Sequence, residues 1–104
     1  MSKTKTISEL TNLLAKALRH RIGSIVNVNE IYAQKYSKDA DVLMKEAAKI
    51  VGKENWNNYD KVKIKEQLRK KLRVELEKKE FLDERKFDIM EEEIGKTLKI
   101  LALA

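Results

Sequence analysis

The sequence predicts an all-α protein, namely a compact, antiparallel four-helix bundle that ends in a C-terminal helical hairpin. The 104-residue chain has no proline and only three glycines, and 38% of its residues are charged. Such a composition favours helices. Apolar residues recur at three- and four-residue spacing in four segments that short links separate. A chain of this length forms one domain. We expect that domain over residues 6–104, after a disordered N-terminus of residues 1–5.

The first helix is expected over residues 6–22. It opens with the run from Thr6 to Glu9, in which the threonine and glutamate side chains form a capping box. Gly23 is expected to end the helix, because glycine adopts the left-handed conformation of many helix ends without a steric penalty. The apolar residues of the segment share one stripe, which consists of Ile7, Leu10, Leu13, Leu14, Ala17, Leu18 and Ile22.

The second helix is expected over residues 29–51, with Asn29 as its N-cap and a kink near Ser37. The β-branched run Ile25–Val28 before it favours an extended link. After this helix comes the polar loop KENWNNYD. We expect Trp56 in this loop to pack over the end of the bundle.

The third and fourth helices are expected over residues 59–80 and 83–103, and the short link between them forces an antiparallel hairpin. The third helix carries only about two apolar residues per heptad, which is typical of a seam that faces a partner helix. The ending 98–104 places apolar side chains on more than one face. The candidate protein interface therefore consists of Leu68, Leu72, Leu76, Leu98 and Leu101. An ordinary intramolecular core explains the same residues equally well.

The charges are spread unevenly along the chain, whose net charge is +6. Residues 61–73 hold seven Lys or Arg and one Glu, whereas residues 74–93 hold nine acidic residues and four basic ones. Clustered cations bind a phosphate backbone by displacing its counterions. The candidate phosphate contacts lie on the third helix and in the last turn of the first, and they are Lys63, Lys70, Arg73, Arg19, His20 and Arg21.

Two other interpretations compete with phosphate binding. The hairpin folds the basic third helix back towards the acidic fourth, so that Lys70, Lys71 and Arg73 face Glu91, Glu92 and Glu93 and are neutralised internally. Cations in the last turn of a helix also interact favourably with its dipole, which explains Arg19, His20 and Arg21 without a ligand.

His20 is the only histidine and the only candidate for a chemical centre. The run His20–Val26 resembles the phosphoacceptor box of sensor histidine kinases, because His-Arg is followed by an aliphatic residue. It lacks the proline of that box, and we do not assign the chain to that family. No third group can be assigned to orient His20 and Ser24 as a catalytic pair.

The remaining composition excludes several classes of function. Without cysteine the chain builds neither disulfides nor thiolate metal sites. Consecutive acidic residues on a helix point in different directions and do not converge on a cation. We therefore expect no enzyme, metal site or cofactor. No segment has the apolar core of a signal peptide or approaches the roughly 18 apolar residues of a membrane helix, so we expect a cytoplasmic protein without membrane contact.

Two hypotheses follow for the function. The first is a small, non-enzymatic helical interaction module that acts by self-association, as a homo-oligomer, or by docking a partner protein. The alternative is a small basic nucleic-acid-binding or regulatory protein that contacts phosphates through the third helix and the end of the first.

Overall fold

The computed structural model describes residues 2–26, 30–79 and 84–104, apart from the side chains of residues 30–32. It contains four helices, α1 (Lys3–Val26), α2 (Glu30–Val51), α3 (Asn58–Glu77) and α4 (Arg85–Ile100), and no strand in these residues. The prediction of a compact all-α bundle is confirmed. In the described part of the chain, no helix combines the length and the apolar character needed to cross a membrane.

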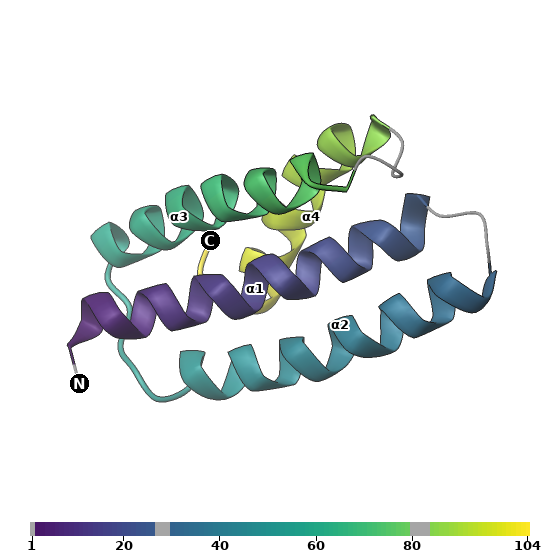
Figure 1. Ribbon diagram of the computed structural model, residues 1–104. Helices are drawn as coiled ribbons and strands as arrows, with labels where there is room; N and C mark the ends of the chain where they lie inside the picture. The colour runs from purple at the N-terminus through teal and green to yellow at the C-terminus, as the bar shows by residue number, and fades with distance from the viewer. Residues whose placement is uncertain (1, 27–29, 80–83) are drawn as a thin grey trace.

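Helix α1 lies at the centre of the bundle (Figure 1). It contacts each of the other three helices, whereas α2 contacts α1 alone among the described residues. Helices α1 and α3 run in the same direction, and α2 runs antiparallel to α1 on its other side (Figure 1). Helix α4 turns back after α3 and contacts both α1 and α3. In the view of Figure 1, α4 therefore lies behind the α1–α3 pair, and α2 lies along the side of α1 that faces away from α3.

The core is formed by the apolar stripes that the spacing predicts. The stripe of α3 is completely buried, and the stripes of α1 and α4 close around it. Each large aliphatic side chain removed from water contributes about 1.5–3 kcal/mol to folding. The largest of these buried side chains are Ile7, Leu10, Leu14, Leu18, Ile22, Ile64, Leu68, Leu72, Leu76, Met90, Ile94 and Leu103.

Helix α1 is longer at both ends than the sequence predicts. It begins at Lys3, so the prediction of disorder is wrong for residues 3–5, and the capping box of Thr6 and Glu9 does not form. The Thr6 hydroxyl instead donates to the carbonyl of Ser2 from within the first turn. Because the turn before it is already helical, Thr6 is not at the position of a cap.

Gly23 does not end α1, which continues through Ile25 to Val26. A Cβ atom on Gly23 would lie 3.0 Å from Cδ2 of Tyr36 on α2. The glycine therefore serves the close approach of two helices and not a helix end. The expected extended link is wrong for Ile25 and Val26, while the expected N-cap at residue 29 lies outside the described residues.

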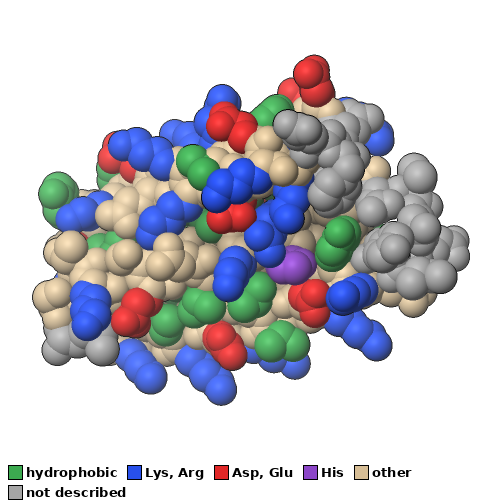
Figure 2. Space-filling model, in the orientation of Figure 1, with side chains coloured by type: hydrophobic (Ala, Val, Ile, Leu, Met, Phe, Trp, Pro, Cys, Tyr) green, Lys and Arg blue, Asp and Glu red, His purple; other side chains and the backbone are tan. Residues whose placement is uncertain are grey.

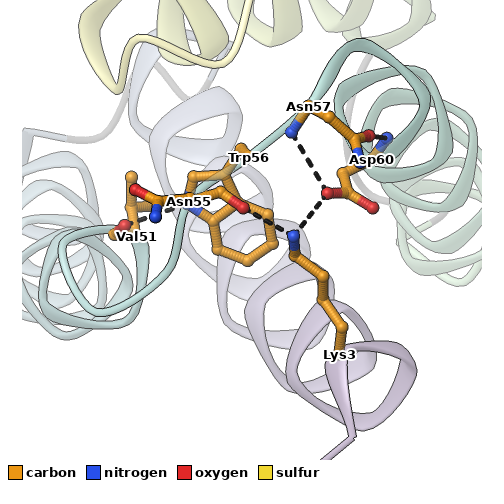
Figure 3. Close-up of polar contacts among 6 residues, drawn as sticks. All are labelled: Lys3, Val51, Asn55, Trp56, Asn57 and Asp60. Carbon is orange, nitrogen blue, oxygen red and sulfur yellow. Dashed lines mark hydrogen bonds and ion pairs between the residues drawn. The ribbon is translucent and has the colours of Figure 1, made fainter.

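The chain between α2 and α3 packs over one end of the bundle (Figure 3). Trp56 packs against the core and donates its indole N–H to the carbonyl of Val51 at 2.9 Å, which confirms the prediction for this residue. Asn57 and Asp60 form the capping box of α3, each side chain accepting from the other's backbone N–H. Lys3 of α1 reaches the Asp60 carboxylate at 2.8 Å. The start of α1 is thereby tied to the start of α3.

The chain ends in a Schellman motif after α4, which itself ends at Ile100 and not at residue 103. The N–H of Leu103 donates to the carbonyl of Leu98 and that of Ala102 to Lys99. Ala102 adopts the left-handed conformation with φ 58°. The motif turns the chain so that Leu103 is buried in the core. Helix α3 ends at Glu77 and α4 begins at Arg85, a shorter pair than predicted, and residues 80–83 between them lie outside the description.

Candidate phosphate-binding surface

The five leucines predicted to form an interface all lie inside the bundle. Leu68, Leu72 and Leu76 have no exposed surface, and Leu98 and Leu101 are 2% and 9% exposed. The narrow stripe of α3 packs against both α1 and α4. Of the two explanations left open for these residues, the intramolecular core accounts for their burial, and a partner would have to contact other side chains.

The exposed large apolar residues of the described chain do not form the predicted seam. They are distributed over all four helices and consist of Ile25, Val42, Tyr59, Val62, Val74 and Ile100. Single exposed apolar side chains are normal on a protein surface and do not by themselves indicate a partner.

The cations Arg19 and Arg21 do not lie at a helix end, because α1 continues to Val26 and has no basic residue in its last turn. The explanation by the helix dipole is therefore wrong for them. Arg19 instead pairs with Glu75 of α3 at 2.9 Å, and Arg21 lies 3.8 Å from Asp41 of α2. Both pairs join α1 to a neighbouring helix.

On the side of α3 that faces α4, the positive charge is partly neutralised. Arg69 forms a two-pronged pair with Glu91, with nitrogen–oxygen distances of 2.7 and 3.0 Å. Arg73 stacks its guanidinium over Phe87, 5.6 Å from the ring centre. Neutralisation across the hairpin thus occurs through Arg69 and not through the predicted Lys70, Lys71 and Arg73, none of which forms an ion pair with the acidic triplet among the described residues.

Lys71 turns to the opposite side of α3, towards α1. Its Nζ donates to the Thr11 hydroxyl at 2.6 Å and to the carbonyl of Ser8 at 3.1 Å. The Thr11 hydroxyl in turn donates to the carbonyl of Ile7 at 2.9 Å. Burial lowers the pKa of Lys71 below its usual value, because water is removed from the ammonium group. Among the described residues no carboxylate pairs with Lys71.

A groove of about 460 Å³ lies between α1 and α3, beside Lys71. The Glu75 carboxylate is the acidic group of this lining, and it is already paired with Arg19. Figure 2 shows Lys and Arg side chains gathered on the face where α1 and α3 adjoin, close to the single histidine. The groove is lined by Asn12, Ala15, Lys16, Lys70, Lys71, Val74 and Glu75.

Two of the predicted phosphate contacts on α3 lie outside this groove. Lys63 is half-buried near Asp60 at the start of α3, and Arg73 is occupied by Phe87 towards α4. Lys70 is exposed and lines the groove. The structure therefore brings Lys70 together with Lys16 and Lys71, but it does not bring all six predicted residues to one place.

His20 lies between α1 and α2 in a second hollow of about 320 Å³, which shares Lys16 with the groove. Arg19 Nη2 lies 3.0 Å from His20 Nε2, and since arginine only donates, Nε2 accepts and the ring is neutral. Burial, followed by the charge of Arg19, lowers the pKa of His20 below its usual value. The ring tilts against Tyr36 at 5.7 Å between centres.

The surroundings of His20 do not provide an oriented catalytic pair. Its Nδ1 is buried without a hydrogen-bond partner and lies 3.8 Å from the Asp39 carboxylate. Ser24 donates its hydroxyl to the carbonyl of Arg21 at 2.7 Å. In the described part of the chain, no three His, Asp or Glu residues gather in a way that could hold a metal ion.

The polar groove residues that were not predicted as phosphate contacts are Asn12, Lys16, Lys71 and Glu75. Asn12 and Lys16 share one face of a helix because they are four residues apart. Lys71 flanks the leucine stripe of α3. These residues can be recognised as parts of one site only when α1 and α3 are known to be neighbours. Neither the known protein-family models, nor the curated proteins, nor the solved structures contain a significant match to this chain.

Proposed function

We propose that the protein is a non-enzymatic module that binds nucleic acid through phosphate contacts on the α1–α3 face. The observation that supports this proposal is the groove, whose lining holds three lysines and a single carboxylate, that of Glu75, which Arg19 already neutralises. Phosphate contacts release counterions and supply most of the affinity for nucleic acid that does not depend on sequence.

The shape of the surface favours binding of nucleic acid in the groove between α1 and α3 over insertion of α3 into the major groove of DNA. The cations of α3 point in different directions, with Arg69 and Arg73 towards α4 and Lys71 towards α1. A helix that docks in the major groove of DNA presents its contacts on one face. A concave site between two helices suits phosphates that a flexible strand brings to it.

The test is a fluorescence-anisotropy titration of labelled single-stranded RNA and duplex DNA at about 50 and 200 mM salt. We expect binding that weakens by orders of magnitude between these concentrations. The double variant Lys16→Gln/Lys70→Gln should lower the slope of log K against log salt by about 2, or about 1 for each lost phosphate contact.

The matched control is Lys45→Gln/Lys49→Gln, which removes the same charge from exposed positions on α2. We expect it to leave the affinity and the slope close to those of the parent protein. Equal losses in both double variants would mean that net charge, and not the α1–α3 face, attracts the nucleic acid. If the anisotropy does not change with protein concentration at either salt concentration, the proposal is contradicted.

The second candidate function is association with a partner protein or with a second copy of the chain. The hollow between α1 and α2 supports it, since Val42 and Leu43 both line it and together give that surface an apolar character. Sedimentation equilibrium of the parent and of Val42→Asp decides this candidate. A dimer that Val42→Asp dissociates would support it, and a monomer in both proteins would contradict self-association.

A further inference from the structure

We propose that the groove between α1 and α3 is a subsite for a terminal phosphate group, a phosphate monoester such as the one at the 5′ end of an RNA or DNA strand. This inference rests on the proposed function and names the part of the nucleic acid that the groove takes.

The charge of the groove matches a monoester better than a phosphate within a strand. An internal phosphodiester carries one negative charge, whereas a phosphate monoester carries about −1.5 to −2 at neutral pH and offers three strong acceptor oxygens. Three lysines line the groove, namely Lys16, Lys70 and Lys71. With Glu75 held by Arg19 at 2.9 Å, a dianion balances most of the remaining positive charge.

Lys71 is held in place before any ligand arrives. Two of the three N–H donors of an ammonium group are engaged here, by Thr11 Oγ1 and by the carbonyl of Ser8. Because the Thr11 hydroxyl donates its own proton to backbone, its oxygen is left to accept from Lys71. Among the described residues, the third donor of Lys71 has no partner and is available to an anion, and the fixed side chain loses little entropy on binding.

The two exposed lysines complete the site from opposite helices. Lys16 on α1 and Lys70 on α3 are exposed and both line the groove. An oxyanion bound by Lys71 would therefore share the groove with two further lysines, one from each helix. Ala15 and Val74 line the same groove, and Val74 is 50% exposed, so apolar surface is present beside the cations for the attached sugar or base. The volume of about 460 Å³ lies within the usual range of small-ligand pockets, about 300–1,000 Å³.

The test compares two RNA oligonucleotides of one sequence, labelled at the 3′ end, with either a 5′-phosphate or a 5′-hydroxyl. We expect the parent protein to bind the 5′-phosphorylated strand about tenfold more tightly, the factor that 1.4 kcal/mol represents. Lys71→Gln should abolish this preference, and so should Lys16→Gln/Lys70→Gln, whose exposed positions do not put folding at risk.

Lys63→Gln is the matched control, because Lys63 belongs to α3 but does not line the groove. It should weaken both strands by the same factor and leave the preference for the 5′-phosphate unchanged. A preference that persists in both groove variants would overturn the assignment to this groove.

Two further outcomes separate the subsite from the proposed function. Equal, salt-sensitive binding of both strands would overturn the subsite while supporting nucleic-acid binding. If neither strand binds, the proposed function fails, and ¹H–¹⁵N NMR titration with adenosine monophosphate against adenosine decides the subsite alone. Amide shifts around Thr11 and Lys71 with the monophosphate only would support the subsite for a free nucleotide, and their absence would overturn it.

Discussion

Ala102 occupies a position at which glycine is the favoured residue. Its φ of 58° places it in the left-handed region, which costs an L-residue roughly 1–2 kcal/mol. Ala102→Gly should therefore raise the free energy of unfolding by about 1 kcal/mol, because the Schellman motif that buries Leu103 already has its hydrogen bonds. Urea unfolding followed by circular dichroism measures the change.

Gly95 provides the opposite control for this substitution. It lies exposed within α4, and a Cβ added there would meet no atom within 4 Å. Gly95→Ala should stabilise the protein by about 0.5–1 kcal/mol through helix propensity alone. If Ala102→Gly destabilises the protein while Gly95→Ala stabilises it, the left-handed turn after α4 is contradicted.

His20 makes the stability of the fold depend on pH. Burial and the neighbouring charges of Arg19, Lys79 and Lys16 lower its pKa, and Asp39 opposes them. Since the folded state prefers the neutral ring, the contribution to stability is complete above the unfolded-state pKa of about 6.5. That contribution decreases as the pH falls below 6.5 towards the lower pKa of the folded protein.

Two measurements check this expectation. Because the chain has a single histidine, its ring Hε1 signal can be followed without overlap from other histidines in a proton NMR titration, and the midpoint should lie below 6.5. The urea midpoint should be lower at pH 5 than at pH 7.5 in the parent, and His20→Gln should reduce this difference. A titration midpoint at or above 6.5 would contradict a buried, neutral ring.

At the scale of elements, the start of α3 depends on one polar side chain. Asn57 accepts the N–H of Asp60 at 2.8 Å and so satisfies a helix donor that would otherwise have no partner. Asn57→Ala should lower the free energy of unfolding by about 1 kcal/mol, the usual effect of removing an N-cap. Asn58→Ala at the adjacent exposed position is the control, and equal urea midpoints in the two variants would contradict the role of the cap.

The helices could be predicted from the sequence because their apolar spacing reports which face is buried. Their ends could not, since several residues can act as a cap or a stop. Thr6 with Glu9 matches a capping box, yet α1 begins at Lys3, where contact with Asp60 of α3 ties down its first turn. Gly23 matches a helix end, yet tertiary contact with Tyr36 is its reason. Both errors arise from contacts between helices, which local pattern does not contain.

At the scale of the whole molecule, the site was only partly predictable for the same reason. Lys70 was found because the density of cations on α3 is visible in the sequence. Lys16 and Lys71 join it only because α1 and α3 lie side by side in the same direction (Figure 1). For the five leucines Leu68, Leu72, Leu76, Leu98 and Leu101, the sequence leaves a partner interface and an intramolecular core equally open, because it does not show how the helices pack.

The arrangement also predicts which part of the bundle opens most readily. Among the residues that the structure describes, helix α2 contacts α1 alone, and of its described side chains only Ala40 and Ala47 are buried. Helix α1, by contrast, contacts all three other helices and carries a continuous buried stripe. Local stability follows the amount of buried apolar contact. In native-state hydrogen exchange, the amides of α2 should therefore be less protected than those in the centres of α1 and α3.

The lower stability expected for α2 does not extend to the proposed phosphate site. The groove that holds Lys16, Lys70 and Lys71 is lined by α1 and α3 and by no residue of α2. Opening of α2 would expose His20 and its hollow but would leave the α1–α3 groove and the contacts of α4 in place. Exchange with mononucleotide present should consequently slow in α1 and α3 around Thr11 and Lys71 while α2 remains unchanged. Equal protection of α2 and α3 in the free protein would contradict this division of the bundle.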